Sequence, residues 1–514
     1  MSSPHSKAAA GADTIIVGAG SAGSVIAARM TERGDHEVML LEAGPDYEPD
    51  AELPADLRDG TRNSLFSHDW RFFHRPMPGQ VLFAFPRGRV VGGSSAVNTC
   101  IALRGRPYDY DEWAALGLPD WSFERCLPAF KRLENDHDFD NEWHGRSGPI
   151  PIRRHPGDEL VPWQAAFLDA CRTLGFPRCG DHNDPTQSGA GPHAMNKVAG
   201  ERMSAARCYL TRQVRARRNL VLRPRTLVRR VLFENRRVTG VEVESDGRVE
   251  TLRARRVVLC AGAILSPAIL LRSGVGPRAE LMRLAVSEVA DVPAVGARLL
   301  DHPGSAIVLV PKRGVSRLEH PLLQTLLRYT SEGSSYPDDM QLQPGSLLPL
   351  PGLSTPLVTL MCCIGKPRGT CQITLPSADP HARPRIDSRF LEDGSDLSRA
   401  VEAIELAWLL GRTPAMRALA HFLWPNESVL GDRAALTGFI RKVTGSGYHP
   451  CGTIPMGPDS DPAAAVDGRG RLRGVQGLIV ADASIMPTIP SANTNLPSLM
   501  IGERFGEWLR DNAL

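Results

Sequence analysis

Residues 13–42 have the sequence DTIIVGAGSAGSVIAARMTERGDHEVMLLE. Apolar residues at 15–17 predict a buried β-strand, and the Ala-rich run at 24–33, after a glycine turn, predicts a helix. A second strand is predicted at 38–41, and it ends in an acid, Glu42. A strand, a glycine turn, a helix, a strand and an acid in this order are typical of a dinucleotide-binding βαβ unit.

Three glycines in the turn have separate mechanical tasks. Gly18 allows a tight turn off the strand, Gly20 lets the backbone approach a pyrophosphate, and Gly23 lets the helix pack on the sheet. Ser21 and Ala22 lie between the last two of these glycines. Because a helix N-terminus attracts anions, we predict that this turn binds the phosphates of a cofactor.

Glu42 follows Gly23 by nineteen residues. At the end of the second strand, a carboxylate can accept hydrogen bonds from both hydroxyls of an adenosine ribose, and it disfavours a ribose 2′-phosphate. The stretch by itself is compatible with NAD and with FAD.

The composition is that of an ordinary folded enzyme. The chain has 514 residues, which exceeds what one core usually covers and predicts two closely joined domains. Hydrophobic residues make up 42% and charged residues 23%, which argues against a disordered chain. The net charge of +3 gives no electrostatic case for nucleic acid as a partner.

Cysteine usage and hydropathy favour a soluble protein of the cytoplasm. The ten cysteines are scattered, without a Cys-x-x-Cys pair or a spaced cluster, so we expect reduced thiols and no metal site. No run of about eighteen apolar residues occurs, so no membrane span is expected. Residues 1–12 are too few and too polar for a secretory signal, and we predict that they form a flexible leader.

The remaining hydrophobic patterns predict further elements. Helices are expected twice within 108–135 and once each at 163–174, 397–410 and 497–509. Short strands are expected to form a β-meander that leads into a buried strand, at 220–222, 228–233, 238–243 and 257–259. An apolar, Leu- and Pro-rich loop is predicted at 347–359, and a buried strand ending in an acid at 477–482.

A second group of small residues lies within 85–98. Gly92, Gly93 and Ser94 follow Arg87 and precede Asn98. Small residues at this density let backbone and hydroxyl donors approach a ligand, although a plain Gly/Ser loop has the same composition.

These motifs are similar to those of the glucose-methanol-choline (GMC) family of FAD-dependent oxidoreductases, and the resemblance extends from residue 13 to residue 509. Its most specific part is GAILSPAILLRSGVG at 262–276, which is similar to the family's second signature at every constrained position. Residues 87–98 resemble the first signature. Shorter similar motifs are Val295-Gly296, Asp301-His302, His449-Pro450-x-Gly452-Thr453, Met456-Gly457, Ala481-Asp482-Ala483-Ser484 and Met486-Pro487.

The resemblance implies an α/β fold with a Rossmann-like FAD-binding domain and a discontinuous α+β substrate domain built on an antiparallel sheet. The FAD-binding domain is expected at 13–150, 200–306 and 445–514. The substrate-binding domain is expected at 151–199 and 307–444.

The resemblance also implies FAD as the cofactor. Some members of the family attach the flavin covalently through a histidine, whereas this chain has Val97 just before Asn98, so we expect non-covalent FAD. The motif near Asp301 usually carries Asn where this chain has Arg298, and we assign no role to that position. Besides the glycine turn and Glu42, the predicted cofactor-binding residues are Arg87, Gly92, Gly93, Ser94, Asn98, Val228, Ala261, Asp482, Ala483, Asn493 and Asn495.

Oxidation of an alcohol by a flavin requires removal of the hydroxyl proton, a path for hydride, and stabilisation of an alkoxide-like transition state. The resemblance implies that His449 is the general base, since a neutral imidazole can accept a proton at physiological pH. The family's second catalytic position is His or Asn and corresponds to Asn493, whose amide would hold the substrate oxygen. His302 is a weaker catalytic candidate, and we expect it to brace its loop against the flavin domain instead.

The substrate is less constrained by the sequence than the reaction. Aromatic residues make up only 6%, which weakens the case for an aromatic cage around a quaternary ammonium group. Apolar runs at 347–353 and 357–364 suggest a hydrophobic pocket wall, although core strands have the same pattern. We predict a primary alcohol with an apolar or aromatic body, and oxygen, a quinone or a protein as electron acceptor.

Three other functions are compatible with the same fold. A hydroxynitrile-lyase-type enzyme would use FAD structurally and cleave cyanohydrins, and a photodecarboxylase-type enzyme would act on fatty acids under blue light. A non-catalytic flavin-binding protein would lose nothing measurable when His449 is replaced.

Overall fold

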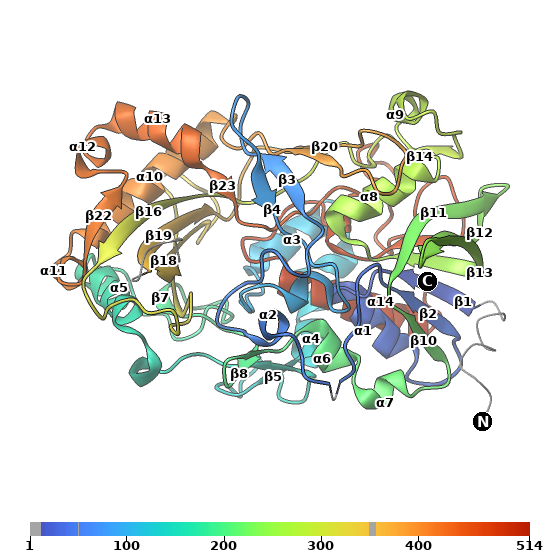
Figure 1. The fold of residues 1–514 in the computed structure, drawn as a ribbon, viewed down its shortest axis with the longest axis horizontal. Helices are drawn as coiled ribbons and strands as arrows, with labels where there is room; N and C mark the ends of the chain where they lie inside the picture. Colours follow the sequence, from blue (N-terminus) through green and yellow to red (C-terminus); the bar gives the residue numbers. More distant parts are fainter. Residues whose placement is uncertain (1–11, 50, 349–355) are drawn as a thin grey trace.

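A mostly parallel sheet surrounds β1 (Ala12–Val17) in the computed structural model, which describes residues 12–49, 51–348 and 356–514 (Figure 1). β1 pairs in parallel with β2 (Val38–Leu41) on one side and with β13 (Arg248–Leu259) on the other. β10 (Leu220–Arg223) adds to β2, and β24 (Leu478–Val480) adds to β13. The carboxyl ends of these parallel strands meet at one edge of the sheet, where ligands bind in such folds.

The predicted meander is partly wrong. β13 does continue into an antiparallel pairing with β12 (Arg237–Ser245), which pairs in turn with β11 (Thr226–Glu234). The first predicted strand of the meander, β10, instead pairs in parallel with β2. A short apolar run does not specify its partner, because a parallel pairing joins segments that are distant in the sequence.

The predicted first helix is α1 (Ser21–Met30), which begins three residues earlier than the sequence predicts. It packs against α14 (Asn495–Arg510), the last helix of the chain. A Cβ atom on Gly502 would lie 2.8 Å from the Cβ of Val25, and one on Gly506 would lie 2.7 Å from the Cβ of Arg29. Glycine at these two positions therefore allows the first and last helices to approach closely.

An antiparallel sheet forms the other end of the molecule, at the left in Figure 1. Its strand order is β22 (Ala420–Trp424), β16 (Pro303–Pro311), β19 (Leu357–Ile364), β18 (Met340–Leu348), β17 (Thr325–Tyr329) and β7 (Gly189–Pro192). Helices α5 (Pro162–Thr173) and α10 (Gly394–Gly411) pack against it. Both helices confirm the sequence prediction within a few residues.

The predicted loop at 347–359 is wrong at both ends. Residues 347–348 belong to β18 and residues 357–359 to β19, while 349–355 lie outside the described residues. The Leu- and Pro-rich composition hides these strands, because a buried strand and an apolar loop have similar composition.

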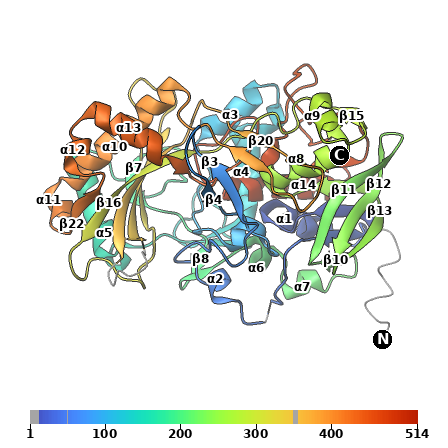
Figure 2. The same ribbon diagram turned by 45° about the horizontal axis from the view of Figure 1, so that its top comes forward.

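A small sheet lies between the two large ones in both views (Figure 1, Figure 2). It combines β3 (Phe72–Arg75) and β4 (Phe83–Phe85) with β20 (Gln372–Thr374) and β21 (Arg385–Asp387). Because β3 pairs with β21, this sheet connects an N-terminal segment to a segment from the second half of the chain.

The predicted domain boundaries do not all coincide with element boundaries. The boundary at 306/307 falls inside β16, and β23 (Gly445–Ser446), which was assigned to the FAD-binding domain, pairs with β16. Ala12, predicted to belong to the leader, is the first residue of β1, and residues 1–11 lie outside the described residues. The division into two discontinuous domains stays a prediction in its details. In the ranges that the structure covers, no helix is both long enough and apolar enough to span a bilayer.

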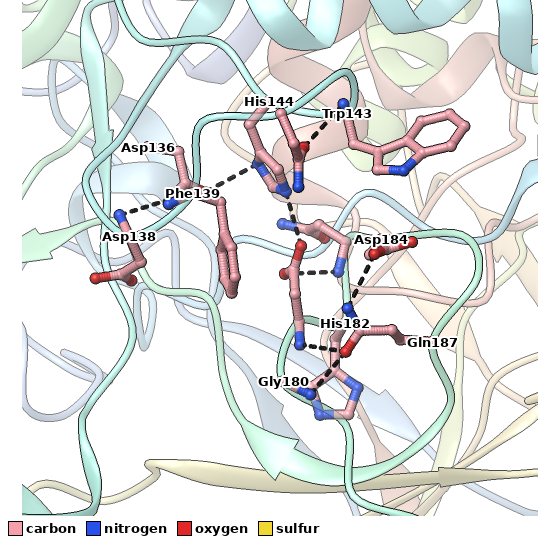
Figure 3. Close-up of polar contacts among 12 residues, drawn as sticks. Asp136, Asp138, Phe139, Trp143, His144, Gly180, His182, Asp184 and Gln187 are labelled. Atoms are coloured by element: carbon pink, nitrogen blue, oxygen red, sulfur yellow. Dashed lines mark hydrogen bonds and ion pairs between the residues drawn. The ribbon is translucent and has the colours of Figure 1, made fainter.

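A buried network of charged side chains joins β5 (Glu134–Asp136) and the segment after it to the loop that carries Asp181. His144 Nδ1 lies 3.0 Å from Asp136 Oδ2, and His144 Nε2 lies 2.7 Å from Asp181 Oδ2. In Figure 3, His144 points toward Asp136 on one side and toward the turn that carries Gly180 on the other. Arg154 donates hydrogen bonds to both carboxylates, at 2.9 Å to Asp136 and 2.6 Å to Asp181.

The buried charges of this network balance. Arg104 pairs with Glu134, so three buried carboxylates face two guanidinium groups and one imidazole, and the partly exposed Asp138 lies 3.3 Å from Arg154 as well. Burial alone would lower the pKa of His144, but hydrogen bonds to the acids outweigh burial and raise it to about 10. Glu134, Asp136 and His144 are spaced like metal ligands, yet the two arginines and a protonated His144 already neutralise the acids.

Replacing His144 with glutamine should lower the free energy of unfolding by about 3–5 kcal/mol, because it leaves buried carboxylates without their cation. The pKa of His144 in the folded chain lies above its unfolded value of about 6.5. The stabilisation is therefore complete below about pH 6.5 and disappears as the pH rises through about 10. Denaturant unfolding of both proteins at several pH values measures this difference.

The matched control is His381→Gln, because His381 also pairs with an acid, Glu244, but its side chain is 57% exposed. Its loss should cost no more than about 1 kcal/mol. Equal losses in the two variants, or a difference that does not change with pH, would contradict a buried, charged His144.

Candidate active site

One cavity draws its walls from both ends of the chain and from its middle. Its volume is about 300 Å³. The predicted cofactor-binding residues that line it are Gly18, Gly20, Ser21, Ala22, Glu42, Arg87, Gly93, Ser94, Asn98, Val228, Ala261, Asp482, Ala483, Asn493 and Asn495. The predicted base, His449, also lines it. The carboxyl edge of the parallel sheet places the first five of these residues together.

Gly23 and Gly92 are the two predicted cofactor residues that do not line the cavity. A Cβ on Gly23 would lie 1.9 Å from the carbonyl oxygen of Gly18, so its task is to pack the helix against the turn. Gly92 has a φ of +103° and donates its N–H to the carbonyl of Ala19 at 2.7 Å. Both residues therefore shape the cavity without lining it.

The two glycine loops touch each other. A Cβ on Gly93 would lie 2.7 Å from the Cα of Gly20. Because neither loop has a side chain at this point, backbone from both sides can approach an extended anionic group closely. This arrangement fits a pyrophosphate.

Glu42 is buried and lines the same cavity. One carboxylate oxygen accepts the N–H of Gly44 at 2.8 Å, and the other accepts the N–H of Ala19 at 3.1 Å. Burial outweighs these bonds and raises the pKa of Glu42 to about 7. A carboxylate has about four acceptor sites, so two backbone bonds leave room for ribose hydroxyls.

Asp482 organises the opposite wall. Its Oδ2 accepts the N–H of Gly262 at 2.8 Å and the hydroxyl of Ser266 at 2.6 Å. These bonds hold the start of α8 (Gly262–Arg272), the helix that contains most of the second signature motif. The short helical turn at Ala483–Ile485 follows directly, and Ala483 lines the cavity.

The two predicted catalytic side chains are in contact. Asn493 Nδ2 lies 2.8 Å from His449 Nε2. On its other side, His449 Nδ1 lies 2.9 Å from His302 Nδ1, and the two rings meet edge to face. His302 thus contacts the predicted base directly, in addition to contacting the loop at Pro490, whose carbonyl lies 3.0 Å from its Nε2.

Asp301 fixes the loop that carries His449. Its Oδ1 accepts the backbone N–H groups of His302 and His449, each at 2.8 Å, and its Oδ2 accepts the hydroxyl of Ser446. Burial raises the pKa of Asp301 to about 6 despite these bonds. The backbone of His449 is therefore held by the residue before His302.

Arg87 brings a positive charge to the same end of the cavity. Its guanidinium donates to the carbonyl of Tyr448 at 2.7 Å and stacks on Phe85, and burial lowers its pKa to about 10, so it stays charged at neutral pH. Burial holds the pKa of His449 well below its ordinary value, and electrostatic interactions with the His302 ring and the Arg87 guanidinium lower it further. His449 is consequently a neutral imidazole at physiological pH.

Arg298, to which no role was assigned, braces two loops. It donates to the carbonyl of Pro487 at 2.6 Å and to that of Gly452 at 3.3 Å. Gly452 lies three residues after His449 in the same loop and Pro487 lies six residues before Asn493, so the arginine supports the site without lining the cavity.

Two buried amide atoms in the cavity wall have no hydrogen-bond partner within the part of the chain that the structure covers. These atoms are Asn493 Oδ1 and Asn495 Nδ2. Asn495 uses its other amide atom, Oδ1, to accept the hydroxyl of Ser21 at 2.9 Å. Buried polar groups are rarely left unpaired, so both atoms are placed to meet a polar ligand.

The sequence did not predict the aromatic part of the wall. Trp70, Phe72 and Tyr448 line the cavity. Trp70 and Phe72 lie in the Pro-interrupted region after Glu42, where no periodicity distinguishes them from other loop residues. The apolar run at 357–364, considered as a possible pocket wall, is the core strand β19 instead and is not among the cavity-lining residues.

Comparison with known families and proteins finds oxidoreductases. Two family models, both described as GMC oxidoreductase, match residues 12–304 and residues 367–502. The 5-(hydroxymethyl)furfural oxidase of Methylovorus sp. (strain MP688) is 37% identical over 532 residues, covering 98% of this chain and 99% of that protein. The oxygen-dependent choline dehydrogenase of Photobacterium profundum is 32% identical, covering 98% and 93%.

Solved structures agree in fold. Pyridoxine 4-oxidase from Mesorbium loti has a TM-score of 0.89 and 30% identity, covering 96% of this chain and 98% of that one. A fungal aryl-alcohol oxidase has a TM-score of 0.83 at 21% identity, covering 98% and 99%, which supports the fold alone.

Proposed function

Because the chain belongs to the GMC oxidoreductase family, we propose that it catalyses the FAD-dependent oxidation of a neutral primary alcohol to the aldehyde. The observation that carries this proposal is the contact between His449 and Asn493, 2.8 Å apart in the wall of the cavity. A neutral base beside an amide can take a hydroxyl proton and hold the oxygen that loses it.

The residues of the cavity fit FAD along its whole length. The touching glycine loops would hold the pyrophosphate, Glu42 the adenosine ribose, and the unpaired amides of Asn493 and Asn495 the flavin end. When bound, FAD supplies the group that accepts a hydride from the carbinol carbon.

The protein's own part in the reaction is proton transfer and positioning. His449 is neutral, so its Nε2 can accept the hydroxyl proton of the alcohol. Asn493 would bind the substrate oxygen and keep the carbinol C–H group oriented. The guanidinium of Arg87, which lines the same cavity, favours negative charge developing on that oxygen.

FAD is expected to be released when the protein is denatured. Val97, at the place where some family members have the histidine that bonds to flavin, lines the cavity and also packs with Leu57, Val90 and Ala96. An aliphatic side chain cannot form that bond. Acid precipitation should leave all of the yellow colour in the supernatant, and colour that stays with the pellet would contradict non-covalent binding.

The cavity favours a neutral substrate with an apolar or aromatic body. Trp70, Phe72 and Tyr448 supply an aromatic wall, while Arg87 supplies a positive charge near His449. Among the described residues, the carboxylates that line the cavity are Glu42 and Asp482, and both hold backbone N–H groups. A quaternary ammonium group such as that of choline would therefore meet the Arg87 cation, while Asp301, the carboxylate that holds the His449 loop, does not line the cavity.

Anaerobic mixing of the holoenzyme with alcohols tests both class and substrate. Loss of the oxidised-flavin absorbance is expected with 5-(hydroxymethyl)furfural and benzyl alcohol, and little or none with choline. If the colour persists with every alcohol while a cyanohydrin is cleaved, or a fatty acid is decarboxylated under blue light, alcohol oxidation is refuted. Fast bleaching by choline alone would refute the neutral substrate but keep the reaction class.

We propose oxygen as the electron acceptor, because the relatives at 37% and 30% identity are named as oxidases. Timed admission of air to the reduced enzyme, with peroxide measured, separates oxygen from a quinone or protein acceptor. We also propose a reducing compartment such as the cytoplasm, since all ten cysteines are free thiols and nine of them are buried.

A further inference from the structure

We propose that His302 is a positioning residue that fixes the tautomer of His449 and so keeps a lone pair on the Nε2 atom that faces the substrate. This inference rests on the proposed function in one respect, namely that His449 is the base. It goes beyond the bracing of a loop, because it assigns His302 a direct effect on where the proton of His449 resides.

The argument begins at the carbonyl of Pro490. His302 Nε2 lies 3.0 Å from this oxygen, which can only accept a hydrogen bond. Nε2 of His302 must therefore carry a hydrogen. His302 is 1% exposed, and burial lowers its pKa to about 3, so the ring is neutral and its Nδ1 has a lone pair.

The contact between His302 and His449 then determines which nitrogen of His449 carries the hydrogen. The two Nδ1 atoms lie 2.9 Å apart, and one of them must donate. Since Nδ1 of His302 has only a lone pair, Nδ1 of His449 carries the hydrogen. His449 is neutral, so its Nε2 is left with the lone pair, and this atom accepts from Asn493 Nδ2 at 2.8 Å.

The opposite arrangement of hydrogens is incompatible with the contact between His302 and the carbonyl of Pro490. If the amide of Asn493 were turned over, its oxygen would face His449 Nε2, and that nitrogen would need the hydrogen. His449 Nδ1 would then need a donor from His302, whose own Nε2 would be left with a lone pair 3.0 Å from the carbonyl of Pro490. Two lone pairs would face each other in a buried site, which is repulsive, so the carbonyl selects the first arrangement.

The neighbouring charges support the same state. Arg87 and Lys366 are the cations that act on the two rings, and both disfavour an imidazolium. When the alcohol reacts, its O–H bond breaks and a new N–H bond forms at Nε2 of His449; FAD, when bound, would take the hydride from the carbinol carbon. The hydrogen on Nδ1 stays on His449 and continues to donate to His302.

Two substitutions separate this role from packing. His302→Leu removes the acceptor and should slow anaerobic flavin reduction about 10- to 100-fold, a part of what a general base contributes. His302→Asn keeps an acceptor near the Nδ1 position and should restore most of the rate. The matched control is His182→Leu, because His182 is 1% exposed, has a pKa of about 3 and does not line the cavity.

A direct reading of the tautomer does not depend on turnover. Histidine ¹⁵N shifts of the holoenzyme, assigned by the signals that disappear in His449→Gln, should show a protonated Nδ1 and an unprotonated Nε2 on His449. His302→Leu should convert this to a mixture of tautomers, and His182→Leu should not.

A protonated Nε2 on His449 in the wild type, or an unchanged tautomer in His302→Leu, would overturn the inference. So would equal rate losses in His302→Leu and His302→Asn, because they would indicate packing alone. If no alcohol reduces the flavin, the proposed function fails, but the NMR result still decides whether His302 sets the tautomer.

Discussion

Anaerobic flavin reduction by the alcohol should slow about a hundred- to ten-thousand-fold when His449 is replaced with glutamine, which is the range expected for loss of a general base. Glutamine can keep a hydrogen bond to Asn493, but an amide cannot take a proton at neutral pH. Stopped-flow measurement of the flavin absorbance gives the rate. FAD content should be unchanged, because the residues proposed to anchor the cofactor, at the glycine loops and at Glu42, are not altered.

His421→Gln is the control for this experiment, since His421 is exposed and does not line the cavity. It should reduce flavin at the wild-type rate. A His449→Gln enzyme that keeps the full rate would show that the base lies elsewhere or that the protein is a non-catalytic flavin carrier.

Gly23→Ala should produce protein with almost no bound FAD. The added Cβ would lie 1.9 Å from the carbonyl oxygen of Gly18, far inside contact distance, and that atom belongs to backbone that cannot rotate away. The helix must shift off the turn, which opens the phosphate site and costs about 1–3 kcal/mol or more in the free energy of unfolding. The ratio of flavin to protein absorbance, with the unfolding midpoint, measures both effects.

Gly438→Ala is the matched control. Gly438 lies on the exposed side of helix α13 (Arg433–Val443), and a Cβ there would meet no atom within 4 Å. It should bind FAD normally and gain about 0.4–1 kcal/mol in stability. Normal FAD content in Gly23→Ala would contradict the assignment of the turn to the cofactor.

The parts of the site that could be predicted are those where close approach limits the residue type. Gly18 and Gly23 were informative because no side chain fits where a helix meets a strand end. The block at 262–276 was informative because it contains all of α8 (Gly262–Arg272). Most residues of this short helix are buried, so its packing and its two ends restrict the residue type at most positions. Short-range constraints of this kind leave a pattern in the sequence itself.

The parts that could not be predicted depend on distant segments meeting. The parallel pairing of β10 with β2 has no local signature, and neither do Trp70 and Phe72 as cavity walls. The contact between His302 and His449 joins residues 147 positions apart, so the sequence does not show that the two rings share a hydrogen bond. These features depend on which segments meet in the folded chain, and the residues next to them in the sequence do not indicate which segments those are.

The close packing of α1 on α14 has a consequence for how the protein is made. The first βαβ unit emerges early from the ribosome, but α14 and β24, which cover its helix and extend its sheet, are translated several hundred residues later. Contacts of such large sequence separation form slowly. Because Asn495 and Ser498 of α14 line the cavity, its wall is complete only after the last helix has been made.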